Sequence, residues 1–298
     1  MKIVIAGGAG YLGKLLTEYY RKKKENQIYI LTRTQQLNVE NVNYLQWDGK
    51  TKGYWTNFLE NTDLLINLTG KSVNCRYTAK NKAEIYSSRL QSTNVLCKVI
   101  QELRFPPKVF IQSSSATIYR YSKDKLMTEA DGEIGIDFSM DVCKKWEQVF
   151  NAFELPKTKK IITRTSIVIG NKGGAFPIMK RMTKFGLGGK QGDGEQYISW
   201  ISEEDYINAI NFLITQKSGV YNLCVPNPIK NAAFQKELRQ KLKVSLGLPS
   251  PKWMLKLGAK FIGTETELLL KSRNVYPKKL LDLGFKFQTD NFYEFKIE

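Results

Sequence analysis

The opening segment, KIVIAGGAGYLGKLL, constrains the fold of this chain more than any other stretch. An apolar run of strand length passes directly into glycines and then into a helical pattern. Glycines placed there allow a tight turn, close approach of the main chain to a pyrophosphate and close packing of helix on strand. Free N–H groups at the helix start favour negative charge. The segment therefore predicts a dinucleotide site; the alternative is a glycine-rich turn that binds nothing. The expected contact residues are Gly7, Gly10, Tyr11, Leu12 and Gly13.

The second apolar run, IYILTRT, ends in Arg33. A dinucleotide fold that prefers NAD usually carries an acidic residue there for the ribose hydroxyl groups, whereas a guanidinium suits a 2′-phosphate. No Asp or Glu follows until Glu40. We therefore expect NADP as the cofactor, with NADPH preferred over NADH. The alternative is an unpaired arginine at the surface.

Further segments are expected to line the same cofactor. Asp48, in QWDGK, is expected to contact the adenine edge, and the backbone of NLTG, which ends the fourth apolar run, is expected to lie along the dinucleotide. The expected contacts from NLTG are Leu68, Thr69 and Gly70. Ser113, directly after the apolar run at residues 108–112, is another expected contact.

Short apolar runs alternate with helical periodicity over the first half of the chain. The predicted strands are residues 2–6, 28–32, 43–46, 63–67, 108–112 and 160–163, and predicted helices between them include 11–24, 80–103 and 138–153. This alternation predicts an α/β fold of the Rossmann type, a doubly wound parallel sheet with helices on both faces.

After about residue 169 the pattern changes to helical patches with few strands. These patches are residues 176–185, 203–215, 231–243, 252–263 and 265–270. They predict a smaller, mostly helical C-terminal lobe. We assign residues 1–168 to an NADP-binding domain and residues 169–298 to a substrate-side lobe that packs against it and is partly interleaved with it.

The composition excludes several classes of function. The 298 residues include no histidine, which excludes serine–histidine hydrolysis and removes the commonest metal ligand. The four cysteines, Cys75, Cys97, Cys143 and Cys224, form no CxxC pair, so neither a zinc site nor a disulfide framework is indicated and we expect no metal. A reducing cytoplasm is the expected location.

The chain is strongly basic. Its 46 Lys and Arg residues against 28 Asp and Glu give a net charge of +18, which attracts nucleic acid, acidic membranes and small polyanions alike. The lysines are scattered, and no nucleic-acid motif or aromatic platform accompanies them, so nucleic acid is not the expected partner. No apolar run is long enough to span a bilayer, and we expect no membrane association.

Several motifs together resemble those of the extended and atypical short-chain dehydrogenase/reductases. GGAGYLG resembles their glycine loop, INLTG their fourth-strand motif, and FIQSSSATIY the strand that carries their catalytic serine. The segments SSRLQST, DFSMDVCKKWE, GGAFPIMKRMTKFGLGG and RNVYPKKLLDLGFKF resemble the subgroup labelled the epimerase family, or nucleoside-diphosphate-sugar epimerase-like proteins. The resemblance extends over nearly the whole chain. It implies a Rossmann-type NADP-binding domain and a small C-terminal lobe that closes over a substrate cleft.

The resemblance also implies a Tyr-x-x-x-Lys pair on a helix, in which the lysine lowers the pKa of the tyrosine so that it exchanges a proton with the substrate. Ser115 matches the serine that orients the reacting oxygen. By the usual separation, however, Ser139 stands at the tyrosine position and Cys143 at the lysine position, so both members of the pair are missing. Arg89 stands where an asparagine is usual on the preceding helix.

Three candidate catalytic residues besides Ser115 each have a structural alternative. Cys143 is expected either to have a lowered pKa beside Arg89 and the nicotinamide, or to be a small buried hydrophobic residue. Arg89 is expected either to bind a carboxylate or phosphate of the substrate, or to form a surface ion pair with Glu84 or a neighbouring residue. Tyr119 is expected either to supply a phenol beside the nicotinamide or to pack in the core.

These observations favour an NADP-dependent oxidoreductase or epimerase-like enzyme acting on a small polar metabolite, with Arg89 binding an anionic group of it. Asp205 and Arg164 are expected to hold the two lobes together. Because the tyrosine–lysine pair is missing, the alternative is a non-catalytic NADP(H) sensor or regulatory binding module. A third reading, a nucleic-acid-associated protein, is supported by net charge alone. The sequence leaves a monomer or a homodimer open.

Overall fold

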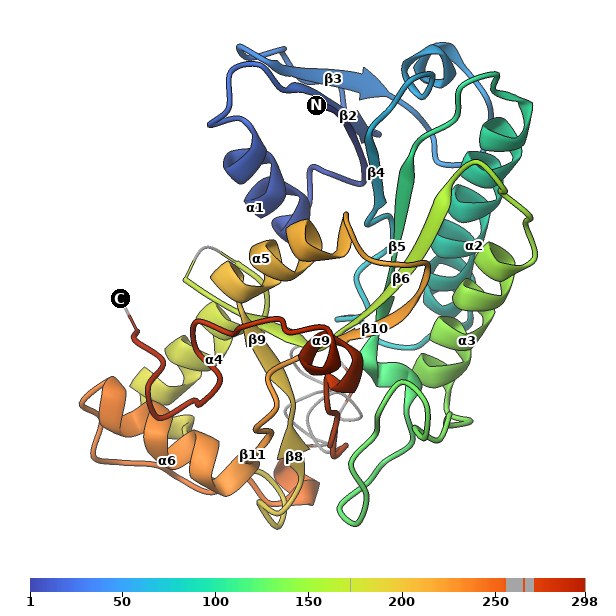
Figure 1. Cartoon of the computed structure of the whole chain (residues 1–298). Coiled ribbons are helices and arrows are strands. Elements are labelled where there is room, and N and C mark those ends of the chain that lie inside the picture. Colours follow the sequence, from blue (N-terminus) through green and yellow to red (C-terminus); the bar gives the residue numbers. More distant parts are fainter. Residues whose placement is uncertain (172, 256–264, 266–270, 298) are drawn as a thin grey trace.

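The computed structural model describes residues 1–171, 173–255, 265 and 271–297. Its centre is a parallel sheet with helices on both faces, and a smaller group of short elements lies at one end of it (Figure 1). The predicted fold class is confirmed.

Seven parallel strands form the main sheet in the order β10-β6-β5-β4-β1-β2-β3. They are β1 (Lys2–Ala6), β2 (Gln27–Thr32), β3 (Val42–Gln46), β4 (Leu64–Asn67), β5 (Val109–Ser115), β6 (Lys159–Thr165) and β10 (Gly219–Leu223). The chain runs from β1 outward to β3 and then returns to the other side of β1, so the strand order reverses between β1 and β4. In sheets of this kind, ligands bind beyond the carboxyl ends of the strands at that reversal.

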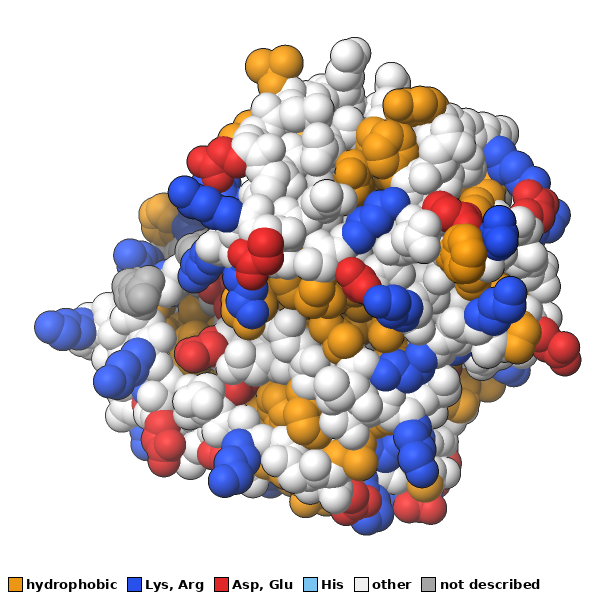
Figure 2. All heavy atoms as spheres, turned by 45° about the horizontal axis from the view of Figure 1, so that its top comes forward, with side chains coloured by type: hydrophobic (Ala, Val, Ile, Leu, Met, Phe, Trp, Pro, Cys, Tyr) orange, Lys and Arg blue, Asp and Glu red, His pale blue; other side chains and the backbone are white. Residues whose placement is uncertain are grey.

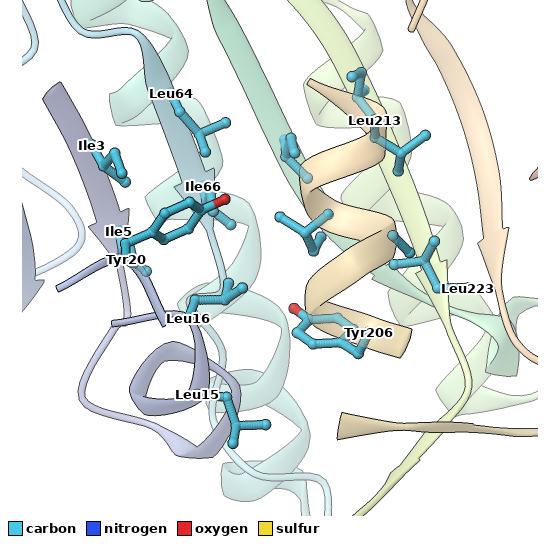
Figure 3. Packing of buried hydrophobic residues seen from close by; sticks show 14 of the residues in the cluster. Ile3, Ile5, Leu15, Leu16, Tyr20, Leu64, Ile66, Tyr206, Leu213 and Leu223 are labelled. Atoms are coloured by element: carbon cyan, nitrogen blue, oxygen red, sulfur yellow. The ribbon is translucent and has the colours of Figure 1, made fainter. Parts of the chain in front are cut away.

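The two faces of the sheet are covered by different helices. Helices α1 (Tyr11–Tyr20) and α5 (Glu203–Leu213) cover one face, and α2 (Ala79–Glu102) and α3 (Phe138–Asn151) cover the other. Alternate residues of β1 point to opposite faces, and the four after Lys2 are apolar and fully buried, which is typical of a strand buried on both sides. Figure 3 shows Ile3 and Ile5 of β1 on the same face as residues of both α1 and α5.

Strand β10 and the packing of α5 were not predicted from the sequence. The strand pairs in parallel with β6, from Gly219 opposite Ile161 to Leu223 opposite Thr165, and α5 packs on the same core as α1. A segment from the second half of the chain thus completes the main sheet, and the two halves interleave. The assigned boundary between residues 168 and 169 stays a prediction.

The smaller group of elements is built around two short strand pairs. Strand β7 (Ile167–Ile169) pairs in parallel with β9 (Trp200–Ser202), and β8 (Tyr197–Ile198) pairs antiparallel with β11 (Ile229–Lys230). Helix α9 (Lys278–Asp282) lies instead against β10, and its Leu280 belongs to the core of the main sheet. Helices α4 (Phe176–Met182) and α6 (Asn231–Lys241) accompany the two strand pairs. Their core is rich in aromatic rings and includes Trp200, Phe234, Phe292 and Phe295.

Several predicted helix limits were wrong for local reasons. Helix α1 ends at Tyr20 rather than at residue 24, because the side-chain amide of Asn26 donates a hydrogen bond to the Tyr20 carbonyl at 2.8 Å. The helix predicted over 176–185 is split into α4 and a wide helical turn, η3 (Thr183–Leu187), where Gly186 has a φ of +77°. Of the helix predicted over 252–263, only the helical residues 252–255 are described. Of the helix predicted over 265–270, only residue 265 is described.

Positive charge is spread over the surface. Figure 2 shows Lys and Arg side chains scattered across one face and interspersed with Asp and Glu, rather than gathered into one stripe. Within the described ranges, no helix combines the length and apolar content needed to cross a membrane.

Candidate functional site

The glycine loop lies at the reversal of strand order, against the loop that follows β4. Gly7 has a φ of +74°, and a Cβ on it would lie 2.9 Å from the backbone of Thr69. A Cβ on Gly13 would lie 2.4 Å from the Gly8 backbone, so α1 and the loop are in direct contact. The two segments predicted to line a dinucleotide are therefore brought together, and only glycine fits at both positions.

The first backbone amides of α1 lie beside the crevice between the glycine loop and the loop after β4. Gly10 is the N-cap residue and has no side chain that satisfies the first N–H groups of the helix. A Cβ there would meet nothing closer than the Gly7 carbonyl oxygen at 3.5 Å, so packing does not require glycine at position 10. A ligand that approaches the main chain would require it.

Tyr11 connects the glycine loop to the smaller group of elements. Its hydroxyl group donates a hydrogen bond to Oε1 of Glu203, the first residue of α5, at 2.7 Å. Burial and this bond raise the pKa of Tyr11. Its ring lies against Gly173 and Gly174, where an added Cβ would come within 2.5 and 2.8 Å. The segment after β7 is thereby held over the start of α1, an arrangement that the sequence reasoning missed.

A cavity of about 490 Å³ opens beside the glycine loop and along the first turns of α1, with Gln36 and Tyr44 on its other side. Arg33, the expected ligand of a 2′-phosphate, is exposed directly after β2 and three residues before Gln36. Its role stays a prediction. Asp48 is also exposed, and its carboxylate accepts hydrogen bonds from the backbone of Thr51 and Lys50 at 2.8 Å, which lower its pKa. Asp48 thus stabilises its own turn, and its expected adenine contact is untested.

The loop after β4 leads from the cofactor segments to Arg89. The amide of Leu68 donates to the Ala6 carbonyl at 2.9 Å, and that of Thr69 donates to Asn67 Oδ1 at 3.1 Å. A Cβ on Gly70 would lie 2.8 Å from Cζ of Arg89. The predicted cofactor loop and the predicted substrate residue are therefore in contact.

The environment of Arg89 contradicts the expected surface ion pair. Glu84 pairs with Lys71 instead. The Nη1 of Arg89 donates to the carbonyls of Lys71 at 3.0 Å and Ile85 at 3.2 Å, and Cζ lies 5.2 Å from the centre of the Trp146 ring. Burial lowers the pKa of this guanidinium. Arg89 is thus held in a fixed position at the inner side of α2.

Ser115 and Cys143 lie next to each other. Ser115 ends β5, half-buried, and its Oγ accepts a hydrogen bond from the amide of Thr117 at 3.2 Å. The backbone of Ser115 also interacts with the Cys143 thiol on α3. Ser113, two residues earlier on β5, is half-buried.

The expected lowering of the Cys143 pKa is wrong. Burial raises the pKa of this thiol to about 11, and the nearby guanidinium of Arg89 only partly opposes the rise. Cys143 packs with Ala116, Ile118 and Val275, in agreement with the alternative of a small buried hydrophobic residue. Ser139, at the position expected for tyrosine, is buried as well.

The structure of the Tyr119 region also agrees with the alternative stated for this residue, packing in the core. The ring is fully buried, and its hydroxyl donates to Asn222 Oδ1 at 2.8 Å and accepts from Arg164 Nη1 at 2.9 Å. Arg164 in turn donates to both carboxylate oxygens of Glu147 at 2.9 and 2.8 Å, and Ser114 donates to the same carboxylate at 2.6 Å. The hydroxyl is therefore used within a buried network, not offered to a substrate.

The two residues expected to join the lobes behave differently. Arg164 lies within β6 and ties that strand to α3, so it acts inside the main sheet. Asp205 does reach the end of the chain, since its carboxylate accepts hydrogen bonds from the amides of Gln288 at 2.7 Å and Thr289 at 3.1 Å.

Arg273 is a residue of this region that the sequence reasoning missed. Its charge lies close enough to influence the Cys143 thiol, and its own backbone amide donates to the Tyr197 carbonyl at 2.8 Å. The signal was present, because Arg273 begins the RNVYPKKLL motif. Among the residues that the structure describes, no cluster of His, Cys, Asp and Glu side chains is suited to hold a metal ion.

The parallel sheet and the glycine crevice define a Rossmann-type nucleotide-binding protein. Residues 3–135 match the model of the NAD dependent epimerase/dehydratase family, and residues 250–294 match a domain of unknown function, DUF1731. The chain is 33% identical, over 97% of its length and 95% of the relative, to Epimerase family protein SAR0825 of Staphylococcus aureus (strain MRSA252). It is 32% identical, over 96% of its length and 94% of the relative, to Epimerase family protein YfhF of Bacillus subtilis (strain 168). The chain belongs to the epimerase family, which confirms the resemblance.

Solved structures share the fold. The human epimerase family protein SDR39U1 (isoform 2), determined with NADPH, superposes with a TM-score of 0.87 at 24% identity, covering 98% of this chain and 97% of that one. The nucleoside-diphosphate sugar epimerase of Corynebacterium glutamicum gives a TM-score of 0.77 at 25% identity, covering 98% of this chain and 56% of that one.

Proposed function

We propose that this protein binds NADP(H) in the crevice between β1 and β4 and acts as an oxidoreductase or epimerase-like enzyme on a small polar metabolite with an anionic group. The observation that carries the proposal is one continuous set of contacts. It runs from the glycine loop through Thr69 to Gly70 and Arg89. The charge of Arg89 acts in turn on the Cys143 thiol, which interacts with the backbone of Ser115.

The residues of the crevice suit a pyridine dinucleotide. Gly7 and Gly13 are required by packing, but Gly10 is not, and the uncapped amides that follow it suit a pyrophosphate. The exposed guanidinium of Arg33 suits a 2′-phosphate, which is our reason for preferring NADPH to NADH. That a human relative of the same fold was determined with NADPH supports this preference.

When bound, the nicotinamide would supply the hydride, and the chain would supply positioning and charge. In this proposal the hydroxyl group of Ser115 holds the reacting oxygen, and Arg89 holds the anionic group of the substrate. Cys143 has no role as a base, because a thiol with a pKa of about 11 is protonated at neutral pH.

A non-catalytic NADP(H) sensor is the second candidate function. The observation that favours it is that Ser139 and Cys143, which stand where the tyrosine and lysine are expected, are both buried. This candidate shares the cofactor site and lacks the substrate reaction.

Two measurements test these proposals in sequence. Isothermal titration calorimetry of the purified protein with NADPH and with NADH tests cofactor binding, and heat from neither nucleotide would refute both candidate functions. Incubation of the NADPH-loaded protein with fractionated metabolite pools, followed by absorbance of the reduced nicotinamide, then separates them. Consumption of NADPH by any pool supports an oxidoreductase. Because an epimerase regenerates its nucleotide, the pools are also incubated with the NADP⁺-loaded protein and analysed by chromatography for new isomers, which support an epimerase. Tight binding without either change supports the sensor.

A further inference from the structure

Arg89 is a half-buried cation without a carboxylate partner among the described residues. Its hydrogen bonds go to the two main-chain carbonyls of Lys71 and Ile85, and both use Nη1. Nε and Nη2 donate to none of the described residues, although the guanidinium lies against Gly70 and over the Trp146 ring. A charge taken out of water without an opposite charge is costly. This cost is relieved when an anion lies against the remaining N–H groups.

The segment that carries Arg273 is held in a fixed position next to Cys143. The hydroxyl of Ser272 donates to the Ser122 carbonyl, and the amide of Met127 donates to the Asn274 carbonyl at 2.7 Å. Val275 is fully buried and packs in one cluster with Cys143. The position of Arg273 in the backbone is therefore set by contacts on both sides of it. Arg273 comes from the C-terminal part of the chain, far from Arg89 in the sequence.

We propose that Arg89 and Arg273 together form an oxyanion subsite next to Ser115, which binds a carboxylate or phosphate group of the substrate. A guanidinium presents N–H groups in a planar fork that matches both kinds of oxyanion. The assignment rests on the proposed function, because it places the non-reacting end of the substrate beside the nicotinamide end of the crevice. It adds Arg273 as a second ligand of the anionic group, so that α2 and residues 272–276 bind this group jointly.

The test is calorimetric titration of the NADPH-saturated protein with inorganic phosphate and, separately, with malonate, at constant ionic strength. The two arms distinguish a phosphate from a carboxylate as the preferred oxyanion. We expect saturable binding of at least one, with the dissociation constant raised about tenfold or more in Arg89→Gln and in Arg273→Gln. Arg104→Gln removes one exposed positive charge just beyond the end of α2 and is the matched control, expected to change the constant less than about twofold.

Each variant is first checked for its fold by circular dichroism, and its affinity for NADPH is measured so that every anion titration is run on protein saturated with NADPH. Should a glutamine variant fail to fold, Arg89→Lys and Arg273→Lys keep the charge and lose the fork, and they are expected to weaken the anion about threefold or more. The proposal is overturned if the wild-type protein binds neither anion saturably, or if Arg89 and Arg273 variants bind as the control does. If NADPH itself does not bind, the proposed function fails, and the same titrations without NADPH still decide the subsite.

Discussion

The variant Gly10→Ala tests cofactor binding separately from the stability of the fold. In the free protein the added methyl group would lie 3.5 Å from the nearest atom, the Gly7 carbonyl oxygen, and the φ of −77° suits alanine. Alanine is a poorer N-cap than glycine, so we expect the free energy of unfolding to fall by less than about 1 kcal/mol. The methyl group stands, however, where a pyrophosphate approaches the start of α1.

The affinity for NADPH should fall much further. Displacing the pyrophosphate loses at least one hydrogen bond between an amide and a charged oxygen, worth about 1.5–3 kcal/mol. This corresponds to a dissociation constant raised about tenfold to a hundredfold. Titration calorimetry measures the affinity, and urea unfolding measures the stability.

Gly7→Ala is the contrasting variant. Its left-handed backbone, with a φ of +74°, costs about 1–2 kcal/mol for alanine. A Cβ 2.9 Å from the Thr69 backbone adds about 1–3 kcal/mol of overpacking. Gly7→Ala should therefore destabilise the fold itself. Unchanged NADPH affinity in Gly10→Ala would refute the reasoning, because the amides after Gly10 would then not be the pyrophosphate site.

Three further outcomes are expected. Arg33→Ala should weaken NADPH about tenfold or more and NADH less than about twofold in parallel titrations; equal losses would defeat the assignment to a 2′-phosphate. Glu147→Gln leaves the buried Arg164 without its opposite charge and should lower the free energy of unfolding in urea by about 3–5 kcal/mol, and a loss below about 1 kcal/mol would contradict a structural role for this pair. Burial raises the pKa of Cys143 to about 11 in the folded protein. The contribution of this thiol to the free energy of unfolding is therefore complete below the usual thiol pKa and is lost as pH rises toward 11. Cys143→Ala should therefore flatten the fall of stability above about pH 9, and an unchanged alkaline profile would show that this thiol does not titrate with unfolding.

The sheet was predictable where each strand is a short apolar run bounded by polar residues. Strands β1 to β6 each contain such a run, and all six were predicted, although β3 and β5 also include polar residues. β10 did not stand out, because its five residues, GVYNL, include a polar Asn222 that is buried only through its hydrogen bonds. Short runs of this kind are poorly separated from loops by periodicity, and the pairing of β10 with β6 is a long-range contact that sequence spacing does not encode.

The site was predictable in its backbone and less so in its side chains. Glycine spacing reports a local backbone geometry, and Gly7 and Gly13 have the close contacts expected of them. The state of a side chain depends on what the rest of the chain packs against it. Cys143 is buried by Val275, from the far end of the chain, which is why its pKa shift has the opposite sign to the one expected.

The replacement of tyrosine and lysine changes what this site can do with a proton. A lysine at position 143 would supply both a positive charge and an exchangeable proton, but the Cys143 thiol is neutral at pH 7. Arg89 and Arg273 bring positive charge to the same place, yet a guanidinium releases its proton only far above neutral pH. The positive field is therefore present without the proton relay that the resemblance implies. Anion binding needs only the positive field, whereas hydride transfer to a carbonyl also needs a proton. The enzyme and the sensor therefore differ in whether a proton is delivered, and turnover of NADPH measures this difference.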